Sequence, residues 1–508
     1  MNLLTRSALR LAPLLTAGDG VVVIVLLMAL GWFGTLAAAP ADTVPPEELS
    51  RAVERELRAD PVLQDADLYA ISRHGEVTLG GTVDRLLWQR RAERAAETVR
   101  GVRHVVNRIA VMPPSHVPDL ELAAGAHRAL AAVPGLALTD VTVQVENGRV
   151  QLEGVAGSPA MRDWADEVVA GLMGVREVQN RMSIAPGGAR ADAPLVDALY
   201  RAIAFDGLLE GDRVQVTASG SRATLTGEVN SAAERRRARA LAARAGAAEV
   251  DTSALVVSGG VRTRATAEPP PDAAIEQAVR EALAADPRLH AHRLAVRVQS
   301  GEVKLAGTAP TLAEKQLAAR VARYVRGVRR VHEHVTVTTT DVGGRALAAR
   351  ALAALRADPL VGDQPMAVTV NKDIAVLTGT TATPWQRQHA EAVVAAVPGI
   401  GAVHNQLRAG PRAPFVSDKP YVGAPFIVTQ TSLPADKTTT DQDAAIHEAV
   451  ASQLQWSAFI DAQGIHLSVN RGVATLTGRV ATPMQAALAT QEAYEGGARL
   501  VKNLLAIE

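Results

Sequence analysis

The sequence predicts an α+β protein made of six tandem modules, each with the order helix, strand, strand, helix, strand. Two observations carry the prediction. A short strand that ends in glycine recurs along the chain, as in "ATLTG" at both 223–227 and 474–478. A second glycine follows 19 or 20 residues later in each copy, and a valine stands four positions beyond it. This constant register indicates that one small domain has been duplicated.

The two sets of glycines are treated as residues of the fold motif. Glycine adopts backbone conformations that other residues avoid, so we expect the first set to permit the turn into a helix and the second set to end that helix in a left-handed conformation. The first set is Gly81, Gly154, Gly227, Gly307, Gly379 and Gly478, and the second set is Gly101, Gly174, Gly246, Gly327, Gly399 and Gly497.

A capped helix is expected between the two glycines of each copy. A hydroxyl side chain that can bind an orphan amide of the first helical turn stands four residues after the first glycine in five copies, at Ser158, Ser231, Thr311, Thr383 and Thr482. In the first copy Asp84 is the expected cap. Glutamate or glutamine three residues beyond the cap completes a capping box at Glu234, Glu314, Gln386 and Gln485.

Upstream of the first glycine, two alternating runs meet at a turn signal, as in "VTVQVENGRVQLEG", which predicts a β-hairpin. A helical stretch that stops near proline precedes it, as at Pro61, Pro287 and Pro359. A helical crossover should place the third strand parallel to the second. Each module is therefore predicted to be a three-stranded mixed sheet with two helices on one face.

The predicted organisation has a cytoplasmic N-terminal segment, an anchor or signal segment, six modules and one insertion. The N-terminal segment is 1–17 and the membrane segment is 18–41. Modules 1 to 6 are 44–112, 118–186, 192–258, 271–338, 343–409 and 441–508, and an inserted arm or linker occupies 410–440.

The uncharged run Val21–Ala39 is long enough to cross a bilayer, because 19 residues at about 1.5 Å each approach its roughly 30 Å core. Arg6 and Arg10 precede it and favour a cytoplasmic N-terminus, which places the modules in the periplasm. A retained single-pass anchor is favoured over a signal peptide cleaved in "AAAPA".

Composition excludes several classes of protein. Lys+Arg and Asp+Glu are both 53, which argues against a nucleic-acid partner, and the absence of cysteine excludes disulfides and thiol chemistry. The common catalytic motifs are missing, so we expect neither an enzyme nor a cofactor. "HAH" at 290–292 and "HEH" at 332–334 are interpreted as exposed histidines rather than metal ligands, because neither has a third ligand nearby.

The repeated motif resembles the BON domain of bacterial envelope proteins, in which a V-x-L-x-G strand and a helix are followed by G-V-x-x-V and often asparagine. The fullest matches are "VTLGG…GVRHVVN", "VQLEG…GVREVQN" and "AVLTG…GIGAVHN", with the terminal residue at Asn107, Asn180, Asn405 and Asn503. The resemblance implies an exported protein that binds phospholipid, maintains the envelope under osmotic or other stress, or associates with itself and with other envelope components. It implies no catalysis.

Three groups of residues are candidates for contact with lipid or with another subunit. Arg235, Arg236, Arg237 and Arg239 form either a lipid-facing patch or a solvated helix face. Trp88, Trp164 and Trp385 either enter a bilayer interface or pack in the cores. Phe415, Tyr421 and Phe426 of the arm either pair with a neighbouring subunit or pack on their own chain.

Two hypotheses of function follow. In the first, the anchored modules associate into a homo-oligomeric scaffold, in the form of a ring or pore, by analogy with small modules that build secretion-channel rings. In the second, the chain binds phospholipid or peptidoglycan as an envelope-stress adaptor or chaperone without a closed oligomer.

Overall fold

The computed structural model describes residues 44–60, 62–132, 138–185, 192–209, 213–258, 270–338, 342–358, 360–382, 384–409 and 440–507. No helix within these ranges is long and apolar enough to cross a membrane. The predicted membrane segment Val21–Ala39, and Phe415, Tyr421 and Phe426 of the predicted arm, lie outside the described residues.

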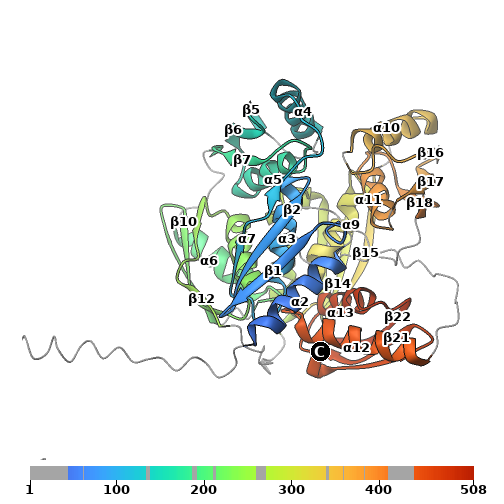
Figure 1. Cartoon of the computed structure of the whole chain (residues 1–508). Coiled ribbons are helices and arrows are strands. Elements are labelled where there is room, and N and C mark those ends of the chain that lie inside the picture. The colour runs from blue at the N-terminus through green and yellow to red at the C-terminus, as the bar shows by residue number, and fades with distance from the viewer. Residues whose placement is uncertain are drawn as a thin grey trace, which may run out of the picture. The chain divides into compact units, whose positions relative to one another are not determined.

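Each module begins with a helix, as predicted (Figure 1). The helix is followed by Asp60 or Asp286 and then by proline in modules 1 and 4, where proline cannot continue it. These first helices are α2 (Pro46–Ala59), α4 (Asp119–Ala132), α6 (Asp192–Ala204), α8 (Asp272–Ala285), α10 (Gly344–Ala357) and α12 (Thr440–Trp456).

An antiparallel hairpin follows the first helix. Its two central turn residues both have positive φ in modules 1 and 2, at His74–Gly75 and Asn147–Gly148, which is the type I′ turn that matches strand twist. The hairpins are β1 (Leu68–Arg73) with β2 (Glu76–Val83), β5 (Leu138–Glu146) with β6 (Arg149–Ala156), β9 (Val214–Ser219) with β10 (Arg222–Val229), β13 (Leu294–Gln299) with β14 (Glu302–Ala309), β16 (Met366–Asn371) with β17 (Ile374–Thr381), and β20 (Ile465–Asn470) with β21 (Val473–Val480).

The third strand runs parallel to the second hairpin strand, as expected from the helical crossover. It is continuous in two modules and divided into two short strands in the other four, which the sequence analysis did not foresee. The continuous strands are β15 (Arg330–Val337) and β22 (Leu500–Ile507). The divided ones are β3 (His104–Asn107) with β4 (Ala110–Val111), β7 (Glu177–Asn180) with β8 (Ser183–Ile184), β11 (Glu249–Asp251) with β12 (Leu255–Val257), and β18 (Ala402–Asn405) with β19 (Arg408–Ala409).

The second helix connects the hairpin to the third strand. Side chains of Ser158, Ser231, Thr311 and Thr482 cap it as predicted. The expected cap at Asp84 is wrong, because the helix of module 1 begins after Arg85 and has no side-chain cap. The second helices are α3 (Leu86–Glu97), α5 (Pro159–Ala170), α7 (Ala232–Ala245), α9 (Leu312–Arg323), α11 (Pro384–Ala395) and α13 (Pro483–Glu495).

Both helices of a module pack on the same face of its sheet. In module 1, Leu49 and Val53 of α2 share one buried cluster with Ala92 of α3 and with Val77 and Leu79 of β2. Alternate residues of β1, such as Tyr69 and Ile71, point to the other face and are exposed. Residues 44–508 form one compact unit, so contacts between modules are part of this fold.

Candidate functional site

The repeated strand glycines lie inside the second hairpin strand rather than at a turn into the helix, which corrects the expectation for this set. Gly81 pairs with Leu68, at the start of the opposite strand, and has φ +118°. A Cβ atom on Gly81 would lie 2.0 Å from the carbonyl oxygen of Asp67, and Gly227, Gly307, Gly379 and Gly478 meet an equivalent oxygen at 2.0–2.2 Å. The motif therefore needs glycine because another backbone segment approaches it.

The second glycines all have positive φ, but only part of the expectation for them holds. Gly246 caps the end of α7 in the left-handed conformation, as predicted. In modules 1 and 4 the helix ends earlier, at Glu97 and Arg323, and Gly101 and Gly327 lie in the turn that follows. There the glycine redirects the chain toward the third strand.

The terminal asparagine of the motif ties the third strand to the second helix. Asn107 Nδ2 donates to the carbonyl oxygen of Gln89 at 2.8 Å, and its Oδ1 accepts from the backbone amide of Ile109 at 3.2 Å. Asn180, Asn405 and Asn503 repeat both hydrogen bonds. This residue is therefore structural, and it spans the point where the third strand divides in modules 1, 2 and 5.

An aspartate near the start of the first helix holds the hairpin turn in three modules, which the sequence analysis missed. Both carboxylate oxygens of Asp119 accept backbone amides of the turn, from Asn147 and Gly148. Asp272 and Asp443 do the same in modules 4 and 6. The signal in the sequence is an acidic residue 28 positions before the turn.

The tryptophans do not form one exposed set. Trp88 is only 8% exposed and belongs to the core of module 1, so its candidacy for lipid contact is wrong. Trp164 is half-buried. The side chain of Trp385 lies outside the described part of the chain.

The arginines of α7 mostly bind protein groups, which corrects the expectation of a lipid-facing or solvated patch. Arg236 bridges Glu93 and Glu97 of module 1. Arg235 donates to the carbonyl oxygen of Arg103 at 3.2 Å, also in module 1. Arg239 alone of the four is exposed.

Arg237 belongs to a contact between modules 3 and 4. Its Nε donates to Asp206 Oδ1 at 2.6 Å, and its guanidinium carbon lies 4.5 Å from the centre of the Tyr324 ring. The arginine run does make specific contacts, but the partners of its side chains are carboxylates and an aromatic ring of this chain.

The paired histidines have carboxylate neighbours. Nδ1 of His290 lies 3.0 Å from Glu314 Oε2, and Nε2 of His332 lies 3.0 Å from Glu302 Oε2. Glu314 also accepts the backbone amide of His290. His292 lies in a short 3-10 helix, Ala291–Arg293, and His290 precedes it, so "HAH" is not the extended pair considered from the sequence.

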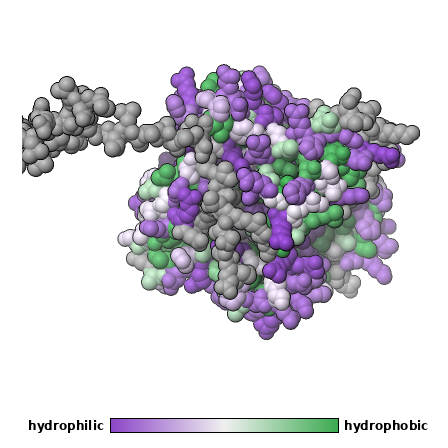
Figure 2. Space-filling view, turned by 90° about the horizontal axis from the view of Figure 1, so that it is seen from below, coloured by the Kyte–Doolittle hydropathy of each residue, from purple (hydrophilic) through white to green (hydrophobic). Residues whose placement is uncertain are grey.

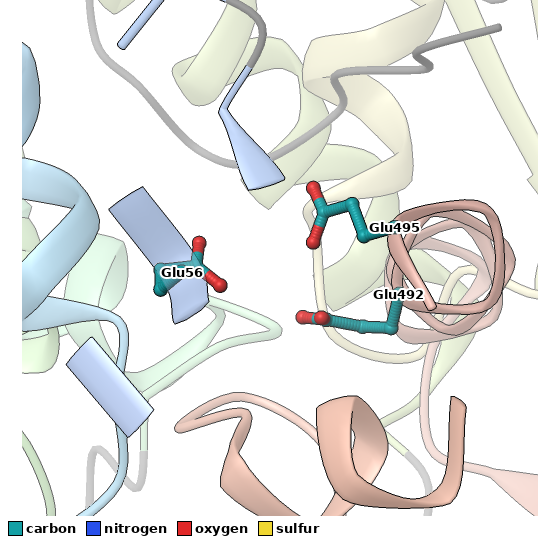
Figure 3. A group of neighbouring side chains, drawn as sticks. All are labelled: Glu56, Glu492 and Glu495. Atoms are coloured by element: carbon teal, nitrogen blue, oxygen red, sulfur yellow. The ribbon is translucent and has the colours of Figure 1, made fainter. Parts of the chain in front are cut away.

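Three carboxylates from opposite ends of the chain converge between modules 1 and 6 (Figure 3). Glu56 of α2 points toward Glu492 and Glu495 of α13, and one oxygen of each lies within 4.8 Å of the others. Thr98 Oγ1 donates to Glu56 at 3.4 Å. Glu56 and Glu492 also line a cavity of about 10 Å³, the size of one water molecule.

Carboxylate oxygens are ligands that Ca²⁺ and Mg²⁺ prefer, so this group is the set through which the described residues could hold a cation. Sequence reasoning missed it because the partners are more than 400 residues apart. A signal was present: Glu56 lies on the buried stripe of its helix, three and seven residues after Val53 and Leu49.

The surface carries polar residues with scattered apolar ones, as the face in Figure 2 shows. On the outer face of the module 1 sheet, Tyr69 is 51% exposed and Ile71 53%, and Met112, just after β4, is 64% exposed. The ring of Tyr69 covers Gly80, where a Cβ atom would lie 2.3 Å from the ring. This is an apolar group on a sheet face that no helix of its own module covers.

The family model of the BON domain matches residues 47–113, 118–186, 191–259, 271–339, 345–411 and 442–508. The chain belongs to the BON-domain family. Its modules are BON domains. The strand glycine is present in all six, and the terminal asparagine is present in four, with Thr252 and Glu333 at its place in modules 3 and 4.

Individual proteins similar to this BON-domain chain were also found. Osmotically-inducible protein Y of Escherichia coli K12 is 27% identical over 144 residues, which cover 27% of this chain and 72% of that protein. Two solved structures of CdsD, a structural protein of the type III secretion system of Chlamydia trachomatis, align with 17% and 14% identity. Each covers 42% of this chain, and 86% and 100% of the solved chain respectively, with a TM-score of 0.12.

The BON modules contact one another through charged side chains of their second helices. Arg90 and Arg94 of α3 pair with Asp166 and Glu167 of α5, joining modules 1 and 2. Burial raises the pKa of Asp166, although Arg90 opposes the rise. Both ion pairs are partly withdrawn from water, so the cost of desolvation offsets part of their attraction.

A second charged contact joins modules 3 and 4. Asp286 is buried at the end of α8, where Arg288 binds it at 2.7 Å and Arg244 of α7 lies at 3.9 Å. Burial would raise the pKa of Asp286, but the hydrogen bond from Arg288 and the two positive charges outweigh it and lower the pKa to about 2.

Proposed function

We propose that this BON-domain protein is an exported, membrane-anchored envelope scaffold whose copies associate into a homo-oligomer, in its fullest form a ring or pore. The observation that carries the proposal is that the BON modules of this chain recognise one another, as in the pairing of Arg90 and Arg94 with module 2 and of Arg236 with module 1. Because BON modules of one chain bind one another, the same surfaces are suited to binding BON modules of other chains.

The test is the native mass of the detergent-extracted full-length protein, measured by size-exclusion chromatography with light scattering and followed by negative-stain imaging. We expect closed particles of several subunits. A variant that lacks 415–433 should lose or reduce this association if the arm contributes to it. A discrete monomer at working concentrations in the unmodified protein would overturn the proposal.

A second candidate is a phospholipid-binding adaptor induced by osmotic stress, as the name of the Escherichia coli relative suggests. The exposed Tyr69 and Ile71 on the outer sheet face favour it, because amphipathic and apolar side chains enter bilayer interfaces. Flotation of the protein with phosphatidylglycerol vesicles tests it. Binding that survives in a Tyr69→Ser, Ile71→Ser variant would exclude this face as the lipid contact.

A further inference from the structure

Two pairs of modules are joined by the same backbone contact. Val99 of module 1 pairs antiparallel with Ser457 of module 6, and Val325 of module 4 pairs antiparallel with Asp206 of module 3. In the first pair, the Arg100 amide donates to the carbonyl oxygen of Trp456 at 2.8 Å, and the Ala458 amide donates to that of Thr98 at 2.9 Å.

The second pair repeats these hydrogen bonds at equivalent residues. The Arg326 amide donates to Phe205, and the Gly207 amide donates to Tyr324, both at 2.7 Å. On one side of each contact stands the pentapeptide "VRGVR", at 99–103 and at 325–329. On the other side an aromatic residue, Trp456 or Phe205, packs against the core of the partner module.

This equivalence follows a duplication of three modules. Modules 1 and 4 share "VRGVR" and modules 3 and 6 share "ATLTG". The strand glycines of modules 1, 2 and 3 recur in modules 4, 5 and 6 after 226, 225 and 251 residues, at Gly307, Gly379 and Gly478. The first module of each half therefore binds the third module of the other half, which is the reciprocal arrangement of a twofold interface.

The two contacts differ in how the chain connects them. Modules 3 and 4 are consecutive, and only 11 residues separate their matched ranges. Module 6 is separated from module 5 by 30 residues, which can span at most about 100 Å. Among the described residues, module 6 has contacts with module 1 and with Leu208, Ala233 and Tyr324 of modules 3 and 4.

The two contacts also differ in charge. At the contact of modules 1 and 6, Glu56 faces Glu492 and Glu495. The same positions at the contact of modules 3 and 4 are Ala282, Leu241 and Arg244, and Arg244 lies near Asp286. The two contacts therefore place different side chains at equivalent positions.

We propose that module 6 is exchanged between copies of the chain, so that module 6 of one copy occupies the place that modules 1, 3 and 4 of a second copy form for it. An exchanged module 6 makes the same contacts with the second copy as it would make within its own chain. Which of the two it binds depends on the effective concentration of its own chain relative to that of the second copy. This inference rests on the proposed self-association and names the surface that carries it.

Cysteine pairs test the exchange in the full-length chain, which has no cysteine of its own. Val99 and Ser457 form the non-hydrogen-bonded kind of antiparallel pair, whose Cα atoms lie about 4.5 Å apart, within disulfide range. Val99→Cys is placed in one tagged copy and Ser457→Cys in a differently tagged copy, and the two are co-expressed and oxidised.

The control pair is Arg201→Cys and Glu281→Cys, which replaces a half-exposed ion pair of 2.9 Å between modules 3 and 4. These two single variants are co-expressed in the same way and treated with a short bis-maleimide. We expect the two tags to be linked for the first pair and not for the control. The native mass of each sample is measured alongside.

The outcomes separate the two proposals. Oligomers with linked tags support the exchange. Oligomers without linked tags, in which a Val99→Cys, Ser457→Cys double variant closes within one chain, overturn the exchange and leave the scaffold proposal standing. A monomer in which the double variant closes within one chain overturns both. No disulfide in the double variant overturns the contact itself.

Discussion

Replacement of Gly307 by alanine tests the role assigned to the strand glycines. A Cβ atom there would lie 2.0 Å from the carbonyl oxygen of Arg293, whereas ordinary contacts begin near 3.4 Å, so the start of β13 must move by more than 1 Å. The φ of +134° is also strained for alanine by about 1–3 kcal/mol. With about one lost hydrogen bond, the total cost is about 3 kcal/mol.

The assay is hydrogen exchange of peptides that cover β13 and β14, because six modules need not unfold together. A loss of about 3 kcal/mol accelerates exchange there by roughly 150-fold, while the hairpin of module 6 keeps its rate. Gly125→Ala is the matched control: Gly125 lies within α4 with no atom within 4 Å of an added Cβ, so alanine should stabilise that helix by about 0.5–1 kcal/mol. A change of less than threefold in module 4 would refute the steric argument.

Three further predictions follow from named contacts. Asn180→Ala removes the hydrogen bonds to Arg162 and Met182 and should weaken module 2 by about 2 kcal/mol, seen as faster exchange in β7 and β8; unchanged exchange would contradict the role of the motif asparagine. Asp286 has a pKa of about 2 in the folded chain, below its unfolded value near 3.9. Its ionised form therefore adds about 2 kcal/mol to the free energy of unfolding above pH 4, and this stabilisation is lost as the pH falls through 2. Acid titration of exchange in α8 should show this dependence, and Asp286→Asn should abolish it; an identical profile in the variant would argue against it. Arg236→Met should loosen the contact of module 1 with module 3 by about 1 kcal/mol, discounted for the partial exposure of Arg236, and leave Glu97 buried; a hydrogen-exchange profile of α3 equal to that of the parent would count against it.

Local patterns predicted most of the module. The caps at Ser158, Ser231, Thr311 and Thr482 lie where the sequence placed them, and the hairpins and the parallel third strand were also confirmed. These features depend on residues close in sequence, so periodicity, turn chemistry and capping reveal them.

The errors have a common physical cause. Gly81 was interpreted as a turn residue because the local sequence does not show the carbonyl oxygen of Asp67, just before β1, which excludes a side chain there. The arginines of α7 were interpreted as a surface patch because Glu93, Glu97 and Asp206 belong to other elements. A pattern within one segment does not report what packs against it.

The sequence by itself determined the number, order and internal topology of the modules, since short-range propensities repeat in register along the chain. Only the tertiary structure decided which modules meet. Val99 and Ser457 are paired across 358 residues, and the carboxylates of Glu56 and Glu492 are brought close together across still more of the chain. Such contacts depend on the complementarity of assembled surfaces, which arises only after each module has folded.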